Sequence, residues 1–149
     1  MTNHLAAMLQ SQHMLQINSF GNDPKELNME QQIEWIRWNT LALEDELHEA
    51  LAETGWKPWA TSKHVNREAF VGELVDAFHF FMNLMLVVDC SAEELADRYF
   101  AKRDKNAKRQ ANGYDGVAGK CGVCKRALDD EAVLCTEDSE HPGHFICWG

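Results

Sequence analysis

The chain has 149 residues, 45% of them hydrophobic, which is enough for one ordinary domain with a core and a small appendage. It carries 24 acidic against 14 basic residues, a net charge of −10, and this excludes a protein that binds nucleic acid through general attraction to phosphate. The N-terminus lacks a basic region followed by an apolar one, and the longest uncharged apolar run, 77–88, is too short to span a bilayer. We therefore expect a cytoplasmic protein without membrane contact, whose five cysteines are thiols or metal ligands.

Apolar residues recur at helical spacing along most of the chain and predict an all-α fold with four principal helices. The first covers 4–18 and ends before GNDPK, and the second runs from about Met29 to Thr54 with Gly55 as its stop. The third, 65–89, is apolar on most sides and is therefore expected to be central. The fourth starts after a capping box, Ser91 with Glu94, and extends to Arg109. The expected core positions of the second helix are Ile33, Ile36, Leu41, Leu43, Leu47 and Leu51.

Two pairs of acidic residues stand three apart on neighbouring predicted helices. Glu46 and Glu49 lie in ELHE, and Glu73 and Asp76 lie in ELVD, inside the most apolar part of the chain. Residues three apart share one helix face, so two antiparallel helices would bring four carboxylates together. Oxygen ligands of this kind suit Mg²⁺ or Mn²⁺. Alternatively, Glu46 and Glu49 belong to a solvated helix face; Glu73 and Asp76 are harder to explain without a positive partner, because burying an unpaired charge is costly.

The fourth predicted helix carries polar groups that suit phosphates. Lys102, Asn106 and Arg109 follow one another at helical spacing on one face. Cations and an amide in a row match the needs of a polyphosphate whose metal ion sits on carboxylates. The alternative is that a basic helix end simply complements the helix dipole.

Cysteine and histidine mark 116–149 as a separate module, which leaves 1–115 as the helical domain. Two knuckles, CGVC and HFIC, form a C-x2-C and H-x2-C pattern typical of structural zinc sites. Their four candidate ligands are Cys121, Cys124, His144 and Cys147. Cys135 and His141 compete as ligands. A piece of this size cannot build its own core, so zinc would supply the folding energy; the alternative is reduced thiols in an unfolded tail.

These residues resemble the all-α nucleoside triphosphate pyrophosphatase superfamily (MazG-like), and within it they are most similar to the dimeric all-α dUTPases and their bacteriophage relatives. The E-x2-E and E-x2-D signature matches between Glu46 and Asp76. WKPW at 56–59 looks like their W-K-x-W segment, and DAFHF at 76–80 looks like D-x2-H-F. The stretch 99–114 resembles Y-x2-K, then N, then R-Q-x2-G-Y, and MLQSQ at 8–12 is similar to their N-terminal glutamine motif. The resemblance covers about residues 8–115.

The resemblance implies a four-helix bundle that assembles as a homodimer or higher oligomer, in the host cytoplasm if the chain is viral. It implies Mg²⁺-dependent hydrolysis of a deoxynucleoside triphosphate, dUTP being favoured, to the monophosphate and pyrophosphate. The four carboxylates would be the catalytic metal ligands, with Glu46 also orienting or deprotonating the attacking water. Lys102, Asn106 and Arg109 would hold the β- and γ-phosphates. The candidates for base and sugar are Gln12, Trp56, Trp59, His79, Phe80 and Asn83.

Two alternatives stay open. Asn83 stands where the dUTPases usually have serine and is more like the MazG branch, so another nucleotide such as dGTP, dATP or dCTP is an alternative substrate. A different class of function is a non-catalytic helical adaptor, with a zinc knuckle that binds a partner and carboxylates that form ordinary salt bridges. The adaptor has no reason to concentrate Glu46, Glu49, Glu73 and Asp76 at one point, so their positions separate the two hypotheses.

Overall fold

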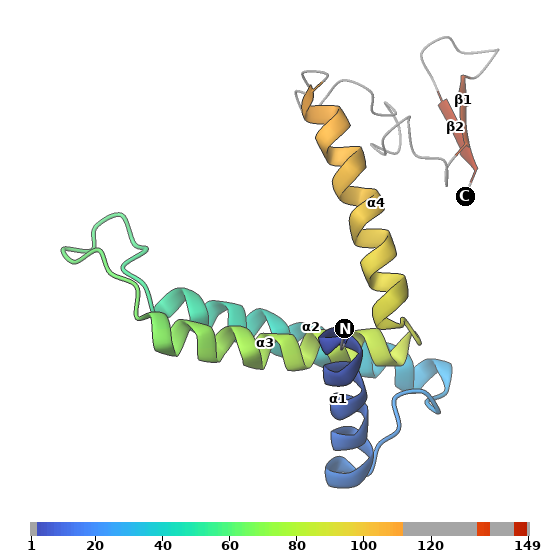
Figure 1. Cartoon of the computed structure of the whole chain (residues 1–149), viewed down its shortest axis with the longest axis horizontal. Helices are drawn as coiled ribbons and strands as arrows, with labels where there is room; N and C mark the ends of the chain where they lie inside the picture. The colour runs from blue at the N-terminus through green and yellow to red at the C-terminus, as the bar shows by residue number, and fades with distance from the viewer. Residues whose placement is uncertain (1–2, 112–133, 138–144, 149) are drawn as a thin grey trace. The chain divides into compact units, whose positions relative to one another are not determined.

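The computed structural model describes residues 3–111, 134–137 and 145–148, and four helices precede two short strands in that part of the chain (Figure 1). The elements are α1 (His4–Phe20), α2 (Met29–Ala52), α3 (Arg67–Val87), α4 (Ala92–Ala111), β1 (Leu134–Glu137) and β2 (Phe145–Trp148). The all-α class predicted for the main part of the chain is confirmed. The chain divides into two compact units, Met1–Tyr99 and Phe100–Gly149, and α4 begins in the first and ends in the second.

Short polar residues fix where the helices begin. The side chain of Asn28 accepts from the backbone N–H of Gln31 at 3.1 Å, and the side chain of Gln31 accepts from the backbone N–H of Asn28 at 3.0 Å, which starts α2 with a reciprocal cap. At α4 the hydroxyl of Ser91 accepts from the backbone N–H of Glu94 at 3.0 Å, as its sequence position predicts. Gly21 ends α1 with φ of 71°, a left-handed conformation that glycine adopts without strain.

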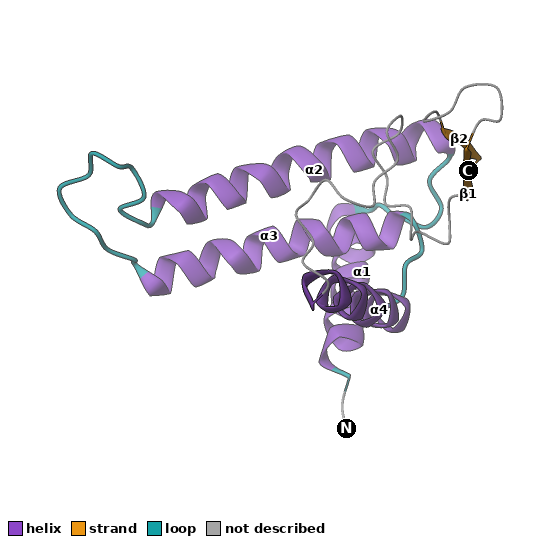
Figure 2. Ribbon diagram, turned by 90° about the horizontal axis from the view of Figure 1, so that it is seen from above, coloured by secondary structure: helices purple, strands orange, loops and turns teal. Residues whose placement is uncertain are grey.

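Helices α2 and α3 lie side by side and antiparallel, and α1 packs across α3 (Figures 1 and 2). The indole N–H of Trp35 on α2 donates to the backbone carbonyl of Asn83 on α3 at 3.2 Å. On the side of α3 that faces α1, the amide of Gln12 reaches both His79 and Asn83. These contacts place α1 and α2 around one polar centre in the second half of α3.

The connection between α2 and α3, residues 53–66, is a loop with a closed neck. The backbone N–H of Gly55 donates to the carbonyl of His64 at 2.9 Å, and Thr54 and Val65 form an isolated antiparallel bridge. Gly55 is not the helix stop expected from the sequence, because α2 already ends at Ala52. A Cβ at position 55 would lie 2.2 Å from the carbonyl oxygen of Ser62, so glycine is required there by close backbone approach.

The core is smaller than the sequence predicts. Helix α3 is the one that both α1 and α2 contact, as expected, but it is not buried on most sides: Ala77, Met82, Met85, Leu86 and Val87 are buried, whereas its first half is mostly exposed. Most expected core positions of α2 are also exposed in the single chain, including Ile33, Ile36, Leu41, Leu47 and Leu51. The physical reason is that α2 packs against α3 along one stripe only, and the described elements cover no other face of it.

By length and composition alone, α3 would suit a membrane-crossing segment, the one such helix among the described residues. The core helix of a soluble protein passes the same test; here 33% of the apolar stretch is buried, and α3 packs against both α1 and α2.

Candidate metal and nucleotide site

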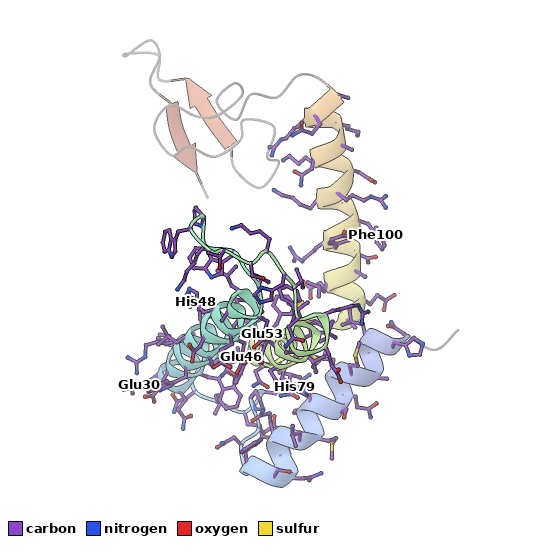
Figure 3. All side chains as sticks on the ribbon, turned by 90° about the vertical axis from the view of Figure 1, so that its left-hand side faces the viewer. Glu30, Glu46, His48, Glu53, His79 and Phe100 are labelled. Atoms are coloured by element: carbon purple, nitrogen blue, oxygen red, sulfur yellow. The ribbon has the colours of Figure 1, made fainter. Side chains whose placement is uncertain are left out.

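Three of the four predicted carboxylates come together between α2 and α3. One oxygen from each of Glu46, Glu49 and Glu73 lies within 4.8 Å of the others. The i, i+3 spacing on α2 and the antiparallel packing of α3 produce this arrangement, as the acidic pattern predicts. In Figure 3, Glu46 lies where α2 faces α3. A cluster of hard oxygen donors at this separation fits the ligand preference of Mg²⁺ or Mn²⁺.

The electrostatics of Glu46 show the crowding of negative charge. Burial is the largest cause that raises the pKa of the Glu46 carboxyl above its ordinary value, followed by the charges of Glu49 and Asp76 and a hydrogen bond with Glu73. The neighbouring groups that act on Glu46 are thus all acidic. A divalent cation would relieve both the repulsion and the cost of burial.

Asp76 differs from the sequence-based expectation. It acts on Glu46 through its charge, but it is not one of the three residues whose oxygens lie within 4.8 Å of one another. Its side chain is exposed, and Glu73 is only half-buried. The premise that both acids are buried in an apolar segment is therefore wrong, because Leu74 and Val75 beside them are exposed as well. Contact with solvent explains why this half of α3 can carry negative charges, and a positive partner is not required.

Three candidates for the base and sugar form one buried polar cluster. The side-chain NH₂ of Gln12 donates to the Asn83 side-chain oxygen at 2.8 Å, and the Gln12 side-chain oxygen lies 2.7 Å from Nδ1 of His79. Gln12 and His79 also line an apolar cavity of about 430 Å³ between α1 and α3. In Figure 3, His79 lies on the side of α3 that faces α1. Phe80 follows His79 on α3 and is half-buried, but it does not line this cavity.

Trp56 and Trp59 lie apart from that cluster. Both are in the loop before α3, where they are exposed, whereas Asn83 is near the other end of the helix. Arg67 and Asn83 are separated by sixteen residues of helix, or roughly 24 Å at 1.5 Å per residue. One chain therefore does not bring the tryptophans and Asn83 to the same nucleobase. Trp56 instead lines a second cavity, about 570 Å³, together with Lys57, His48 and His64.

The phosphate-binding candidates and the zinc ligands belong to the second unit. Lys102, Asn106 and Arg109 lie on α4 as predicted, in the part of it that follows the unit boundary. In the strand pair, Cys135 of β1 stands opposite Cys147 of β2. The other four zinc candidates, Cys121, Cys124, His141 and His144, lie outside the described residues.

One polar residue of α2 at the centre of the first unit, Asn39, was not singled out from the sequence. Asn39 is buried, its side-chain oxygen accepts from the Asn83 side chain at 2.8 Å, and its NH₂ donates to the Trp35 carbonyl at 2.9 Å. The signal available in the sequence was an amide one helical turn after a tryptophan, on a helix with many acidic and amide residues. That signal is too common to distinguish Asn39 from its neighbours.

Comparisons with known proteins agree with this architecture. Residues 4–93 match the protein family described as dUTPase. The dCTP pyrophosphatase of Enterobacteria phage T4 is 29% identical over 106 residues, covering 55% of this chain and 62% of that protein. The dCTP pyrophosphatase of Enterobacteria phage LZ5 is 31% identical over 104 residues, covering 54% and 60%.

The chain thus spans about three fifths of the length of these two relatives. No solved structure matches it. The family match takes in α1, α2, α3 and both acidic pairs, which is more than half of the sequence. The chain therefore belongs to this dUTPase family, among the all-α nucleoside triphosphate pyrophosphatases.

Proposed function

We propose that the chain hydrolyses a deoxynucleoside triphosphate to the monophosphate and pyrophosphate, with Mg²⁺ held by Glu46, Glu49, Glu73 and Asp76. The observation that carries this proposal is the convergence of Glu46, Glu49 and Glu73 from two helices on one point. A family described as dUTPase and two relatives named dCTP pyrophosphatases support it. The same convergence argues against an adaptor, which has no need to concentrate acids.

The residues fit the metal because their ligand atoms are all carboxylate oxygens and a cation would relieve their mutual repulsion. When bound, Mg²⁺ supplies positive charge for the phosphate oxygens and lowers the pKa of a bound water. Glu46, whose carboxyl has a raised pKa through burial and its acidic neighbours, would orient that water and accept its proton. Glu49 would contribute a ligand oxygen from α2 and Glu73 one from α3, and Asp76, three residues after Glu73, would add a fourth carboxylate from α3.

We propose a pyrimidine deoxynucleotide as substrate. The family description names dUTP and the two phage relatives name dCTP, so dUTP and dCTP are the two nucleotides to separate. The favoured dUTP assignment and the alternative dCTP share the same chemistry at the phosphates. The choice between them depends on the residues around the base, for which Gln12, His79 and Asn83 are the candidates that the fold brings together.

A turnover panel tests the proposal. Purified protein is incubated with dUTP, dCTP, dTTP, dATP or dGTP, with and without Mg²⁺, and pyrophosphate is measured. We expect Mg²⁺-dependent release from dUTP or dCTP and a large loss in Glu46→Gln. Glu44→Gln is the matched control, because it makes the same change on the same helix at an exposed acid outside the cluster. Equal turnover in both variants would overturn the assignment of the site.

The nucleotide's phosphates would be held by Lys102, Asn106 and Arg109 on α4. Support comes from their spacing on one face and from the sequence resemblance. We expect Lys102→Met to raise KM more than it lowers kcat, because a β- or γ-phosphate contact serves binding. A variant at Lys108, which lies off this face of α4, provides the comparison.

A second copy of the chain would cover the exposed apolar residues of α2. Ile33 is 61% and Leu41 is 52% exposed in the single chain, far more than is usual for large apolar side chains at helical spacing. A homodimer or higher oligomer would bury them. Sedimentation as a monomer at micromolar concentration would contradict this proposal.

The C-terminal cysteines would hold one zinc ion per chain through Cys121, Cys124, His144 and Cys147, with Cys135 and His141 as competing ligands. The knuckle spacing supports this proposal. Metal analysis of protein purified without chelators is the test, and protein free of zinc would contradict it. Because the helical core does not depend on these residues, chelation should leave most of the helical circular-dichroism signal intact.

A further inference from the structure

A chain of hydrogen bonds between side-chain amides joins α1, α2 and α3. On α2, the Asn39 NH₂ donates to the Trp35 carbonyl (2.9 Å). The Asn83 NH₂ of α3 donates to the Asn39 oxygen (2.8 Å), and the Gln12 NH₂ of α1 donates to the Asn83 oxygen (2.8 Å). The Gln12 oxygen then faces Nδ1 of His79 at 2.7 Å. Gln12, Asn39 and Asn83 are all buried, and every buried side-chain nitrogen or oxygen in the described part of the chain has a partner.

The direction of this chain is fixed at one end. A backbone carbonyl only accepts, so the Asn39 group that faces the Trp35 carbonyl must be its NH₂. The Asn39 oxygen must then accept from the Asn83 NH₂. The Asn83 oxygen is left to accept from the Gln12 NH₂, so the Gln12 oxygen faces His79. Reversing any one amide would place two donors or two acceptors in contact, which is costly in a buried position.

We propose that this chain of amides sets the tautomer of His79, so that Nδ1 carries the proton and Nε2 is left as a hydrogen-bond acceptor for the nucleoside of the substrate. Only an N–H at Nδ1 satisfies the oxygen of Gln12. Neutral imidazole carries one proton, so Nε2 must then accept. Asn39 touches no substrate in this scheme and is a positioning residue, acting through Asn83 and Gln12.

The position of His79 suits this role. It lies three residues after Asp76, so the two side chains are neighbours on one flank of α3. It also lines the apolar cavity of about 430 Å³ between α1 and α3. A nucleoside whose α-phosphate is held near Asp76 would present an N–H of the base or a sugar hydroxyl to Nε2. This last step rests on the proposed function, whereas the tautomer of His79 does not.

The tautomer is measured by ¹⁵N NMR of the full chain without nucleotide, at a pH where the ring is neutral. Two-bond couplings from the ring protons show which nitrogen is protonated. The His79 signals are identified among those of the seven histidines by their loss in His79→Gln. We expect Nδ1–H in the unmodified protein; a predominant Nε2–H form would overturn the proposal.

Two substitutions at Asn39 separate positioning from simple structural damage. Asn39→Asp keeps the oxygen that accepts from Asn83, so the direction of the chain and the Nδ1–H tautomer should persist, although a buried carboxylate next to a carbonyl lowers stability. Asn39→Leu removes the anchor, so Asn83 and Gln12 are free to reverse and the tautomers should mix. A purely structural role predicts the opposite order, with Asp the more harmful change. Retention of pure Nδ1–H in Asn39→Leu would overturn the proposal.

Gln16→Ala is the matched control, because Gln16 is a buried amide on α1 that takes no part in these hydrogen bonds. It should leave the tautomer unchanged.

With dUTP or dCTP, Asn39→Leu should raise KM about tenfold, the effect of losing one hydrogen bond to the ligand, and Asn39→Asp should change it by less than about threefold. Failure of turnover in every protein would contradict the proposed function and leave the tautomer result standing, so the two failures are distinguishable.

Discussion

The two halves of α3 differ in almost every property although they belong to one helix. In the first half Val71, Leu74 and Val75 are exposed, and Glu73 lies in the acidic cluster. In the second half Met82, Asn83, Met85, Leu86 and Val87 are buried, where α1 crosses the α2–α3 pair. All four charged residues of α3 lie in the first half, yet the apolar residues Val71, Leu74 and Val75 are exposed there too, so the difference in packing partners adds to the difference in composition. The proposed chemistry therefore lies at one end of the helix and the stability of the unit lies at the other.

The largest expected effect comes from removing a negative charge from the first half of α3, which tests whether this half serves catalysis and not stability. Glu73→Gln should lower turnover about a thousandfold, because loss of a metal ligand removes several kcal/mol of transition-state stabilisation. Its free energy of unfolding without metal should not fall, since no ion pair found in the described part of the chain involves Glu73. Glu68→Gln, an exposed acid earlier on α3, serves as control. Loss of stability with normal turnover would show that the acids are structural.

The second half should respond in the opposite way. Leu86 is 3% exposed, so Leu86→Ala should lower the free energy of unfolding by about 2–5 kcal/mol, as expected when a buried leucine leaves a cavity. Leu74 is 42% exposed, and Leu74→Ala should cost less than about 1 kcal/mol. Urea titration measures both. Equal losses would mean that another surface covers Leu74, for example in an oligomer, and repeating the titration at several protein concentrations would reveal it.

A smaller effect should appear at Glu46 in the absence of metal. Its pKa is raised above the ordinary 4.5, so the folded chain binds this proton more tightly than the unfolded chain. The associated stability is present below the ordinary pKa and is lost as the pH rises through the raised one. At neutral pH Glu46→Gln should therefore increase the Tm of metal-free protein. Added Mg²⁺ should raise the Tm of the unmodified chain but not that of the variant; no difference at any pH would contradict the crowding of charge.

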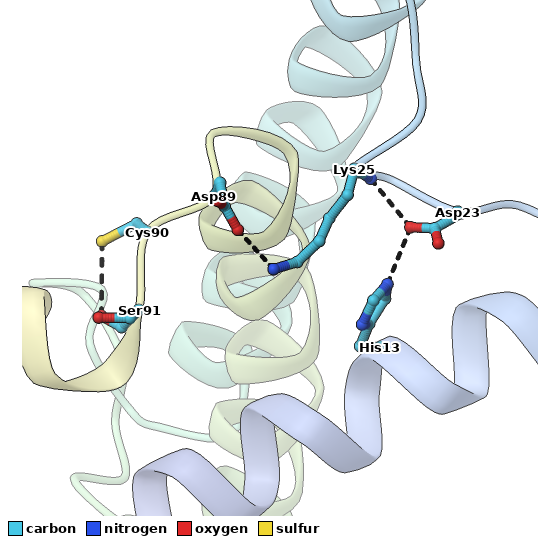
Figure 4. A network of polar contacts seen from close by, with 6 residues as sticks. All are labelled: His13, Asp23, Lys25, Asp89, Cys90 and Ser91. Atoms are coloured by element: carbon cyan, nitrogen blue, oxygen red, sulfur yellow. Dashed lines mark hydrogen bonds and ion pairs between the residues drawn. The ribbon is translucent and has the colours of Figure 1, made fainter.

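The smallest effect concerns the segment between α1 and α2 (Figure 4). A hydrogen bond with His13 at 2.8 Å and then the backbone N–H of Lys25 at 3.0 Å lower the pKa of Asp23 below its ordinary 3.8. Its contribution to stability is present above that value and is lost as the pH falls through the lowered one. Asp23→Asn should lower the Tm slightly at pH 6, and the difference should vanish in strong acid. A difference that persists in strong acid would contradict this account.

The sequence predicted the parts of the molecule that follow local rules. Helical spacing and caps located the four helices to within a few residues, and i, i+3 spacing placed Glu46 and Glu49 on one face with Glu73 opposite them. Burial was not predictable in the same way, because an apolar helix face is buried only where another element reaches it. Asn39 was missed for a related reason: its importance depends on the position of α1, which delivers Gln12, and no local pattern in α2 encodes that.

The closed neck of the loop between α2 and α3 has a consequence for which changes this chain should tolerate. Glu53 is joined to Asn66 by a backbone hydrogen bond of 2.9 Å and a side-chain bond of 2.8 Å, and Gly55 is joined to His64 just beyond. The two helices are thus held in register before the chain enters the loop. Insertions or deletions between Gly55 and His64 should therefore leave α2, α3 and the acidic cluster in place, although changes at Trp56 or Trp59 would alter residues that the resemblance assigns to the nucleotide. Gly55 itself is the position at which such changes must stop, because any side chain there would collide with the returning strand of the neck.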